Sequence, residues 1–212
     1  MTLYIYFAFL LSSLVAGFYY RKILPQGLLL LVWLVLITLI VELMDAYPPK
    51  FLFATTNWIY RIYQPIEYVL LAGFFLSVII SSNKKKLIIV SIPIVVAINL
   101  MNLFVYQQYK SLTTYAFLLA AFLFTVWSIF YFFQLFKSND GENPAHIPAF
   151  WICTGILFFY AGTFFQMGFT NMIYKHNPDL AKKLYVINHL LNCVLYGMIT
   201  YGFICQSKYR KL

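Results

Sequence analysis

Residues 27–46, GLLLLVWLVLITLIVELMDA, form an apolar run that carries no charge before Glu42. A helix needs about 20 such residues to cross the roughly 30 Å hydrocarbon core of a bilayer. The whole chain has this character, because 63% of its 212 residues are hydrophobic, 21% are aromatic and only 10% are charged. A chain with so little polar surface cannot coat a soluble globule. The sequence therefore predicts an integral membrane protein.

Further apolar runs are separated by short clusters of charge, proline and asparagine. With the first run they give seven predicted spans, at residues 2–20, 27–46, 57–82, 87–106, 112–136, 148–170 and 184–206. The runs lack the alternating pattern of an outer-membrane barrel, so we expect an all-α fold, a seven-helix transmembrane bundle. The connections, among them 83–86 and 171–183, are too short to separate domains. Residues 1–212 are thus predicted to form a single transmembrane domain, with little chain left for a soluble enzyme, kinase or DNA-binding domain.

Lysine and arginine residues set the predicted orientation. One side of the membrane would hold nine of them, namely Arg21, Lys22, Lys84, Lys85, Lys86, Lys137, Lys208, Arg210 and Lys211. The other side would hold five, namely Lys50, Lys110, Lys175, Lys182 and Lys183. The positive-inside rule then places the N-terminus outside and the C-terminus in the cytoplasm, in a multi-pass protein of the cytoplasmic (inner) membrane. Because these cations flank spans, we expect the net charge of +9 to meet lipid headgroups of the bilayer rather than nucleic acid.

Polar residues inside the predicted spans carry the functional signal. An ionisable group costs a few kcal/mol in a bilayer, so it usually faces the bundle interior and marks a site. The candidate ligand-binding residues are Glu67, Gln64, Arg61, His189, Asn192, Glu42, Asp45 and Gln166. All project to the outer half of the bundle, which predicts a polar cavity open to the outside above a sealed cytoplasmic half. For Arg61 a second interpretation stays open, an ion pair with a neighbouring carboxylate that only joins the second span to the third.

The predicted spans lack the residues that several kinds of catalysis require. A retinal pigment needs a buried lysine, whereas every lysine here flanks a predicted span. Only His189 among the three histidines lies in a span, so we expect no metal and no other cofactor. No serine or cysteine nucleophile with a matching base can be assembled. The chain is therefore expected not to be an enzyme, and a lipid-modifying enzyme remains only a second alternative.

A weak internal repeat relates the third and seventh predicted spans. The same spacing separates Tyr60, Gln64 and Glu67 as separates Tyr185, His189 and Asn192. It suggests a three-plus-one-plus-three arrangement with these two spans in equivalent places. Pro25 with Gln26 resembles the proline–glutamine step of small seven-helix transporters, although the other half lacks a second copy. A small-solute or proton-coupled transporter, with Glu67 and Glu42 as proton carriers, is therefore the first alternative function.

Three stretches carry a resemblance to a known kind of protein: residues 57–71 (NWIYRIYQPIEYVLL), 148–169 (PAFWICTGILFFYAGTFFQMGF) and 187–205 (INHLLNCVLYGMITYGFIC). Their aromatic and aliphatic patterns surround Glu67, Trp151, Tyr160, Gly162 and Asn192. They resemble short, stand-alone seven-helix bacterial membrane proteins that are regarded as sensory partners of histidine kinases. The resemblance implies signal transduction and no catalytic residue. The leading hypothesis is thus a receptor that binds a small molecule in the outward-facing cavity and signals through a separate cytoplasmic protein such as a histidine kinase.

Overall fold

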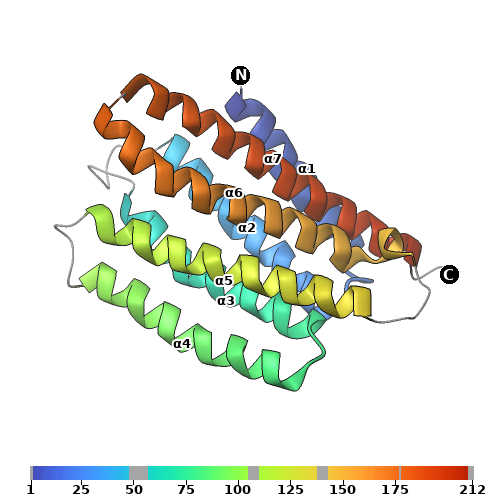
Figure 1. Cartoon of the computed structure of the whole chain (residues 1–212). Helices are drawn as coiled ribbons and strands as arrows, with labels where there is room; N and C mark the ends of the chain where they lie inside the picture. The colour runs from blue at the N-terminus through green and yellow to red at the C-terminus, as the bar shows by residue number, and fades with distance from the viewer. Residues whose placement is uncertain (1, 48–56, 105–109, 138–142, 177, 210–212) are drawn as a thin grey trace. The chain divides into compact units, whose positions relative to one another are not determined.

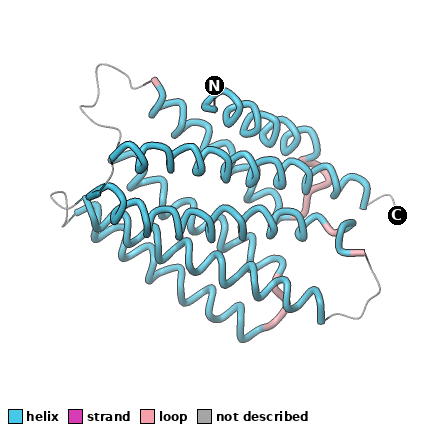
Figure 2. The backbone as a smooth tube through the Cα atoms, turned by 45° about the horizontal axis from the view of Figure 1, so that its top comes forward, coloured by secondary structure: helices cyan, strands magenta, loops and turns pink. Residues whose placement is uncertain are grey.

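A computed structural model describes residues 2–47, 57–104, 110–137, 143–176 and 178–209 (Figure 1). Over these ranges the chain is all-helical and contains no strand (Figure 2), which confirms that the fold is all-α. The helices are α1 (Thr2–Tyr20), α2 (Gln26–Ala46), α3 (Asn57–Val78), α4 (Ser82–Phe104), α5 (Lys110–Lys137), the short 3-10 helix η1 (Pro144–His146), α6 (Pro148–His176) and α7 (Pro178–Tyr209).

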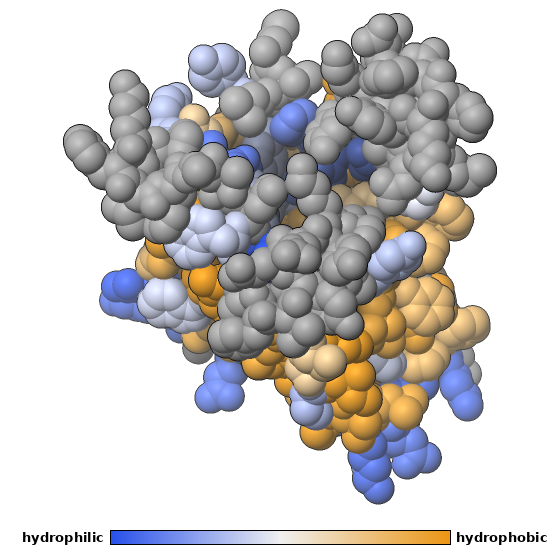
Figure 3. All heavy atoms as spheres, turned by 90° about the vertical axis from the view of Figure 1, so that its left-hand side faces the viewer, coloured by the Kyte–Doolittle hydropathy of each residue, from blue (hydrophilic) through white to orange (hydrophobic). Residues whose placement is uncertain are grey.

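Four segments of the described chain are long and apolar enough to cross a membrane: Gln26–Ala46, Tyr115–Lys137, Pro148–Gly168 and Val186–Lys208. A shorter apolar segment, Tyr4–Tyr20, lies in α1. Large hydrophobic side chains such as Trp33 and Phe133 are exposed, and Figure 3 shows hydrophobic surface, in orange, on one face. In lipid such exposure carries no penalty, because lipid tails are as apolar as these side chains. The helices thus support a membrane protein.

Two predicted connections are wrong. The break between α3 and α4 lies at residues 79–81 rather than 83–86, because the lysine run at 84–86 belongs to the first turns of α4. Lysine is a good helix former, so a charged cluster need not end a helix. Likewise α6 continues to His176 and α7 begins at Pro178, where a connection over 171–183 was expected. Polar residues show where an apolar run ends, but the helix itself can continue through them.

The chain forms two compact units. The central unit, residues 26–120, contains α2, α3 and α4, and α3 packs against both of the other two. The terminal unit combines residues 1–25 with 121–212, and in it α7 packs against both α6 and α1. The second half of α5 lies on α6, where the buried rings of Phe124 and Tyr160 are 4.7 Å apart. Each unit therefore has a middle helix, α3 in one and α7 in the other.

Glycines allow close approach within each helix pair. A Cβ atom added to Gly73 of α3 would lie 2.7 Å from Leu30 Cδ1 of α2. A Cβ atom on Gly202 of α7 would lie 2.6 Å from Ile152 Cγ1 of α6 and 3.2 Å from a backbone carbonyl oxygen of that helix. In a bilayer, where no hydrophobic force drives helices together, such small residues increase van der Waals contact between them.

Candidate functional site

Tyr60 joins the two carboxylates at the C-terminal end of α2. Its hydroxyl donates to Asp45 Oδ2 over 3.2 Å and lies 3.5 Å from Glu42 Oε1. Glu42 and Asp45 are three residues apart, so both lie on one face of α2 and reach a single phenol of α3. Two predicted site residues are thereby brought together.

A second polar group lies one turn deeper between the same helices. The Tyr63 hydroxyl donates to Glu67 Oε1 over 3.2 Å and lies 2.7 Å from Thr38 Oγ1. The Thr38 hydroxyl also donates to the backbone oxygen of Leu34 over 2.8 Å, and both Thr38 and Tyr63 are buried. Tyr63 has one hydroxyl hydrogen, so it can donate to Glu67 or to Thr38 at any moment. The Tyr63 hydroxyl therefore donates either within α3, to Glu67, or across to α2, to Thr38.

Arg61 and Gln64 present buried polar atoms to the same region. Arg61 Nε and Gln64 Oε1 are buried and have no hydrogen-bond partner among the residues that the structure describes. Each such atom costs roughly 1–3 kcal/mol when it stays unsatisfied. One atom is a donor and the other an acceptor, so a ligand with both kinds of polar group would satisfy them.

The remaining predicted residues belong to the terminal unit. The His189 ring lies 6.0 Å from the ring of Tyr6, which is buried in α1. Asn192 Nδ2 donates to the backbone oxygen of Asn188 over 3.0 Å, so it bonds its own helix. Gln166 is half-buried on α6. The structure thus assembles Glu42, Asp45, Arg61, Gln64 and Glu67 within the central unit, and one site made of all eight residues stays a prediction.

The sequence reasoning missed Thr38 and Tyr63. Thr38 is the one hydroxyl residue in the apolar stretch 28–41, and a lone polar residue in such a run needs a partner. Tyr63 precedes Glu67 by four positions, which is the spacing of neighbours on a helix surface. Both signals were present, but only the contact between α2 and α3 shows that they meet.

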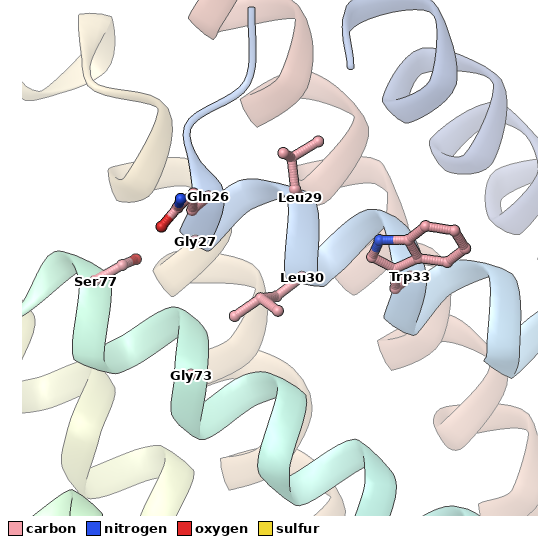
Figure 4. A pocket seen from close by; sticks show the side chains of 7 residues that line it. All are labelled: Gln26, Gly27, Leu29, Leu30, Trp33, Gly73 and Ser77. Carbon is pink, nitrogen blue, oxygen red and sulfur yellow. The ribbon is translucent and has the colours of Figure 1, made fainter. Parts of the chain in front are cut away.

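A pocket of about 410 Å³ lies at the opposite end of the α2–α3 pair (Figure 4). It is lined by Gln26, Gly27, Leu29, Leu30, Trp33, Gly73 and Ser77. Figure 4 shows the Leu30 side chain directed toward Gly73 and Ser77 near the start of α2. This lining contains no ionisable group and none of the predicted site residues. The polar chemistry of the central unit is therefore at the other end of these helices.

Tyr63→Phe should weaken the central unit by about 1–2 kcal/mol, because it removes the hydroxyl that faces both Thr38 and Glu67. Thermal unfolding in detergent would measure the loss. Tyr201→Phe is the matched control, since the Tyr201 hydroxyl makes no hydrogen bond to another described residue and its ring is partly exposed. Equal melting temperatures for the two variants would show that the Tyr63 hydroxyl contributes nothing.

Within either unit, the described residues form no group of three or more histidine, cysteine, aspartate or glutamate side chains that could hold a metal ion. The polar contacts around Tyr60 and Tyr63 therefore stand as the candidate site. No family model, curated protein or solved structure matches this chain.

Proposed function

We propose that this chain is a membrane receptor for a small molecule, which binds at the polar end of the α2–α3 pair. The buried and unmatched Arg61 Nε and Gln64 Oε1 carry the proposal, because they lie on the helix that also presents the bonded Glu67. A ligand with a hydrogen-bond acceptor for Arg61 and a donor for Gln64 would satisfy both atoms.

The proposed topology has seven spans in the bacterial inner membrane, with the N-terminus outside and the C-terminus in the cytoplasm. The excess of lysine and arginine on one side, nine against five, supports it. Under this topology the polar ends of α2 and α3 face outward. The lysines at 84–86 would then face the cytoplasm, where a histidine kinase or another signalling protein could dock.

Receptor activity is favoured over a through-going channel by the contrast between the two ends of α2 and α3. The Glu42–Tyr60 end is rich in polar groups, whereas at the other end Gly27 and Gly73 bring the helices into close contact with Ser77 and Leu30. A helix pair whose ionisable groups lie at one end only can bind a ligand there without giving it a path across. Binding would then act by shifting the packing of α2 against α3.

Glu67→Gln should abolish ligand binding while the protein still folds, because the amide keeps the shape of the side chain and cannot ionise. Purification from native membranes, followed by mass spectrometry of bound small molecules and proteins, tests this. We expect a molecule that is recovered with the unmodified chain and with Thr125→Val, and lost with Glu67→Gln. Thr125 is a suitable control because its hydroxyl bonds only its own helix, at Ala121 O in the terminal unit. Retention of the molecule by Glu67→Gln would refute the site.

A proton-coupled transporter is the second candidate function. The single hydrogen of the Tyr63 hydroxyl favours it, since neutralising Glu67 frees that hydrogen for Thr38 on the neighbouring helix. Proton binding would thereby change the link between α2 and α3. Uptake into proteoliposomes that follows a pH gradient would support transport, and uptake that ignores the gradient would count against it.

A further inference from the structure

The contacts between α2 and α3 recur between α6 and α7 at a constant separation of 125 positions. Gly27 approaches Ser77, and a Cβ atom on this glycine would lie 2.5 Å from Ser77 Cβ. The positions 125 residues later are Ile152 and Gly202, which make the close contact of the other pair, at 2.6 Å from Cβ to Ile152 Cγ1. The contact is the same, but the glycine has moved from the first helix of the pair to the second.

A second close contact follows the same rule. A Cβ atom on Gly73 would lie 2.7 Å from Leu30 Cδ1 in the central unit. The positions 125 residues after Leu30 and Gly73 are Gly155 and Met198. A Cβ atom on Gly155 would lie 2.8 Å from Met198 Cβ. The glycine has again changed helix while the pair of positions stayed in contact. Two independent contacts therefore fix the same register in both helix pairs.

The buried threonines repeat as well. Thr38 of α2 is 4% exposed and Thr163 of α6 is 1% exposed, and the two lie 125 positions apart. Each hydroxyl donates to the carbonyl oxygen four residues earlier, over 2.8 Å to Leu34 and over 2.6 Å to Phe159. The exposed positions match too, since Trp33 of α2 is 55% exposed and Phe158 of α6, 125 positions later, is 59% exposed. A shift of one residue would rotate these positions by about 100° and destroy the match.

We propose that α2–α3 and α6–α7 are two copies of one helix pair, and that the second copy keeps its own binding site at Thr163 and Asn188 for a small molecule with a hydroxyl group. Asn188 stands where the first copy has Tyr63, whose hydroxyl meets the threonine at 2.7 Å. The carboxamide of Asn188 is much shorter than a phenol. Its Oδ1 atom is buried and has no hydrogen-bond partner among the described residues.

The chemistry of the ligand follows from the missing group. In the central unit the protein supplies a phenol beside the buried threonine, and at the equivalent position of the terminal unit it supplies a carboxamide, whose acceptor Asn188 Oδ1 has no partner among the described residues. An acceptor in a dry site needs a donor, so a bound hydroxyl would satisfy it. This inference stands on contacts inside the terminal unit, so it holds whether the proposed receptor site at Glu67 is correct or not.

Asn188→Tyr restores the residue of the first copy and tests the duplication. Its hydroxyl should reach Thr163, so this variant should melt at a higher temperature than Asn188→Phe, which adds the ring alone. Adding Thr163→Val should remove the difference between them. If Asn188→Tyr and Asn188→Phe melt at the same temperature with Thr163 present, the proposed equivalence of positions 63 and 188 is wrong.

Binding of p-cresol, the side-chain analogue of tyrosine, tests the site itself. Isothermal titration of the full chain in nanodiscs should show saturable binding of p-cresol and weaker binding of toluene, which has the ring without the hydroxyl. Asn188→Tyr should weaken p-cresol binding about tenfold or more, a loss of about 1.4 kcal/mol, because the new side chain fills the site. Thr125→Val should leave it unchanged, because the Thr125 hydroxyl bonds Ala121 O of the same helix. Equal affinity for p-cresol and toluene, or equal binding by Asn188→Tyr, would overturn the proposed site.

Discussion

Gly202→Leu should leave little folded protein after extraction into detergent. Even the first added carbon would lie 2.6 Å from Ile152 Cγ1 and 3.2 Å from the backbone oxygen of Pro148, and leucine adds three more carbons. The side chain of Ile152 can turn aside, but the oxygen belongs to the first residue of α6 and cannot move without the helix. Forcing α6 and α7 apart should cost about 3 kcal/mol, the upper part of the range for overpacked cores. Size-exclusion chromatography after mild heating would measure the folded fraction.

Gly168→Leu is the matched control for this prediction. Gly168 also lies in the α6–α7 pair, but a Cβ atom there would meet nothing within 4 Å. Replacing glycine in a helix by a better helix former gains up to about 1 kcal/mol. We therefore expect Gly168→Leu to be at least as stable as the unmodified chain. If both variants unfold alike, the close approach at Gly202 does not determine the packing of α7.

Tyr68→Ala should be the most damaging substitution in the central unit. Tyr68 is 1% exposed in the middle of α3, and its hydroxyl donates to Ser91 Oγ of α4 over 2.8 Å. Removing a buried ring of this size leaves a cavity and costs about 3–5 kcal/mol. Within a bilayer the loss is one of van der Waals contact, because lipid offers an equally apolar surface. Titration with a denaturing detergent, followed by circular dichroism, would measure it.

Tyr68→Phe separates the ring from the hydroxyl. It keeps the ring and removes the hydrogen bond to Ser91, whose own hydroxyl still donates to the backbone oxygen of Ile88 over 2.7 Å. An interhelical hydrogen bond in a membrane contributes about 0.6 kcal/mol on average. Tyr68→Phe should therefore retain most of the stability that Tyr68→Ala loses. Similar losses in both variants would mean that the hydrogen bond, and not the ring, holds α3 to α4.

The apolar runs were enough to predict the helices, because burial in lipid demands long stretches of similar residues whatever their order. The runs that became α1 and α2 were placed within a residue of their observed bounds. The errors fell at polar ends, where the lysines at 84–86 continue a helix that hydropathy alone would stop. Packing within each unit was beyond prediction, because lipid-facing and helix-facing residues are equally apolar in a membrane protein.

The sequence predicted the charged residues of the candidate site but not the hydroxyl groups that bond them. Glu42 and Asp45 could be selected because a carboxylate in a span is costly and therefore informative. An ion pair of Arg61 with a neighbouring carboxylate was one of two interpretations of that residue, and the hydroxyl that reaches both carboxylates belongs to Tyr60. Tyrosine is common throughout this chain, with 18 copies, so its presence at one position carries little information. Only the register of α3 against α2 singles out the tyrosine that bonds.

The contact between α1 and α7 determines which of the two units can fold first during synthesis of the chain. The central unit is one contiguous stretch, so its three helices can assemble while the ribosome is still adding α6 and α7. The terminal unit draws on both ends of the chain, and roughly 160 residues separate the end of α1 from the start of its partner α7. At about 5–20 residues per second, that synthesis takes roughly 8–30 s. For that time α1 remains without the helix it will pack against, and the terminal unit closes last.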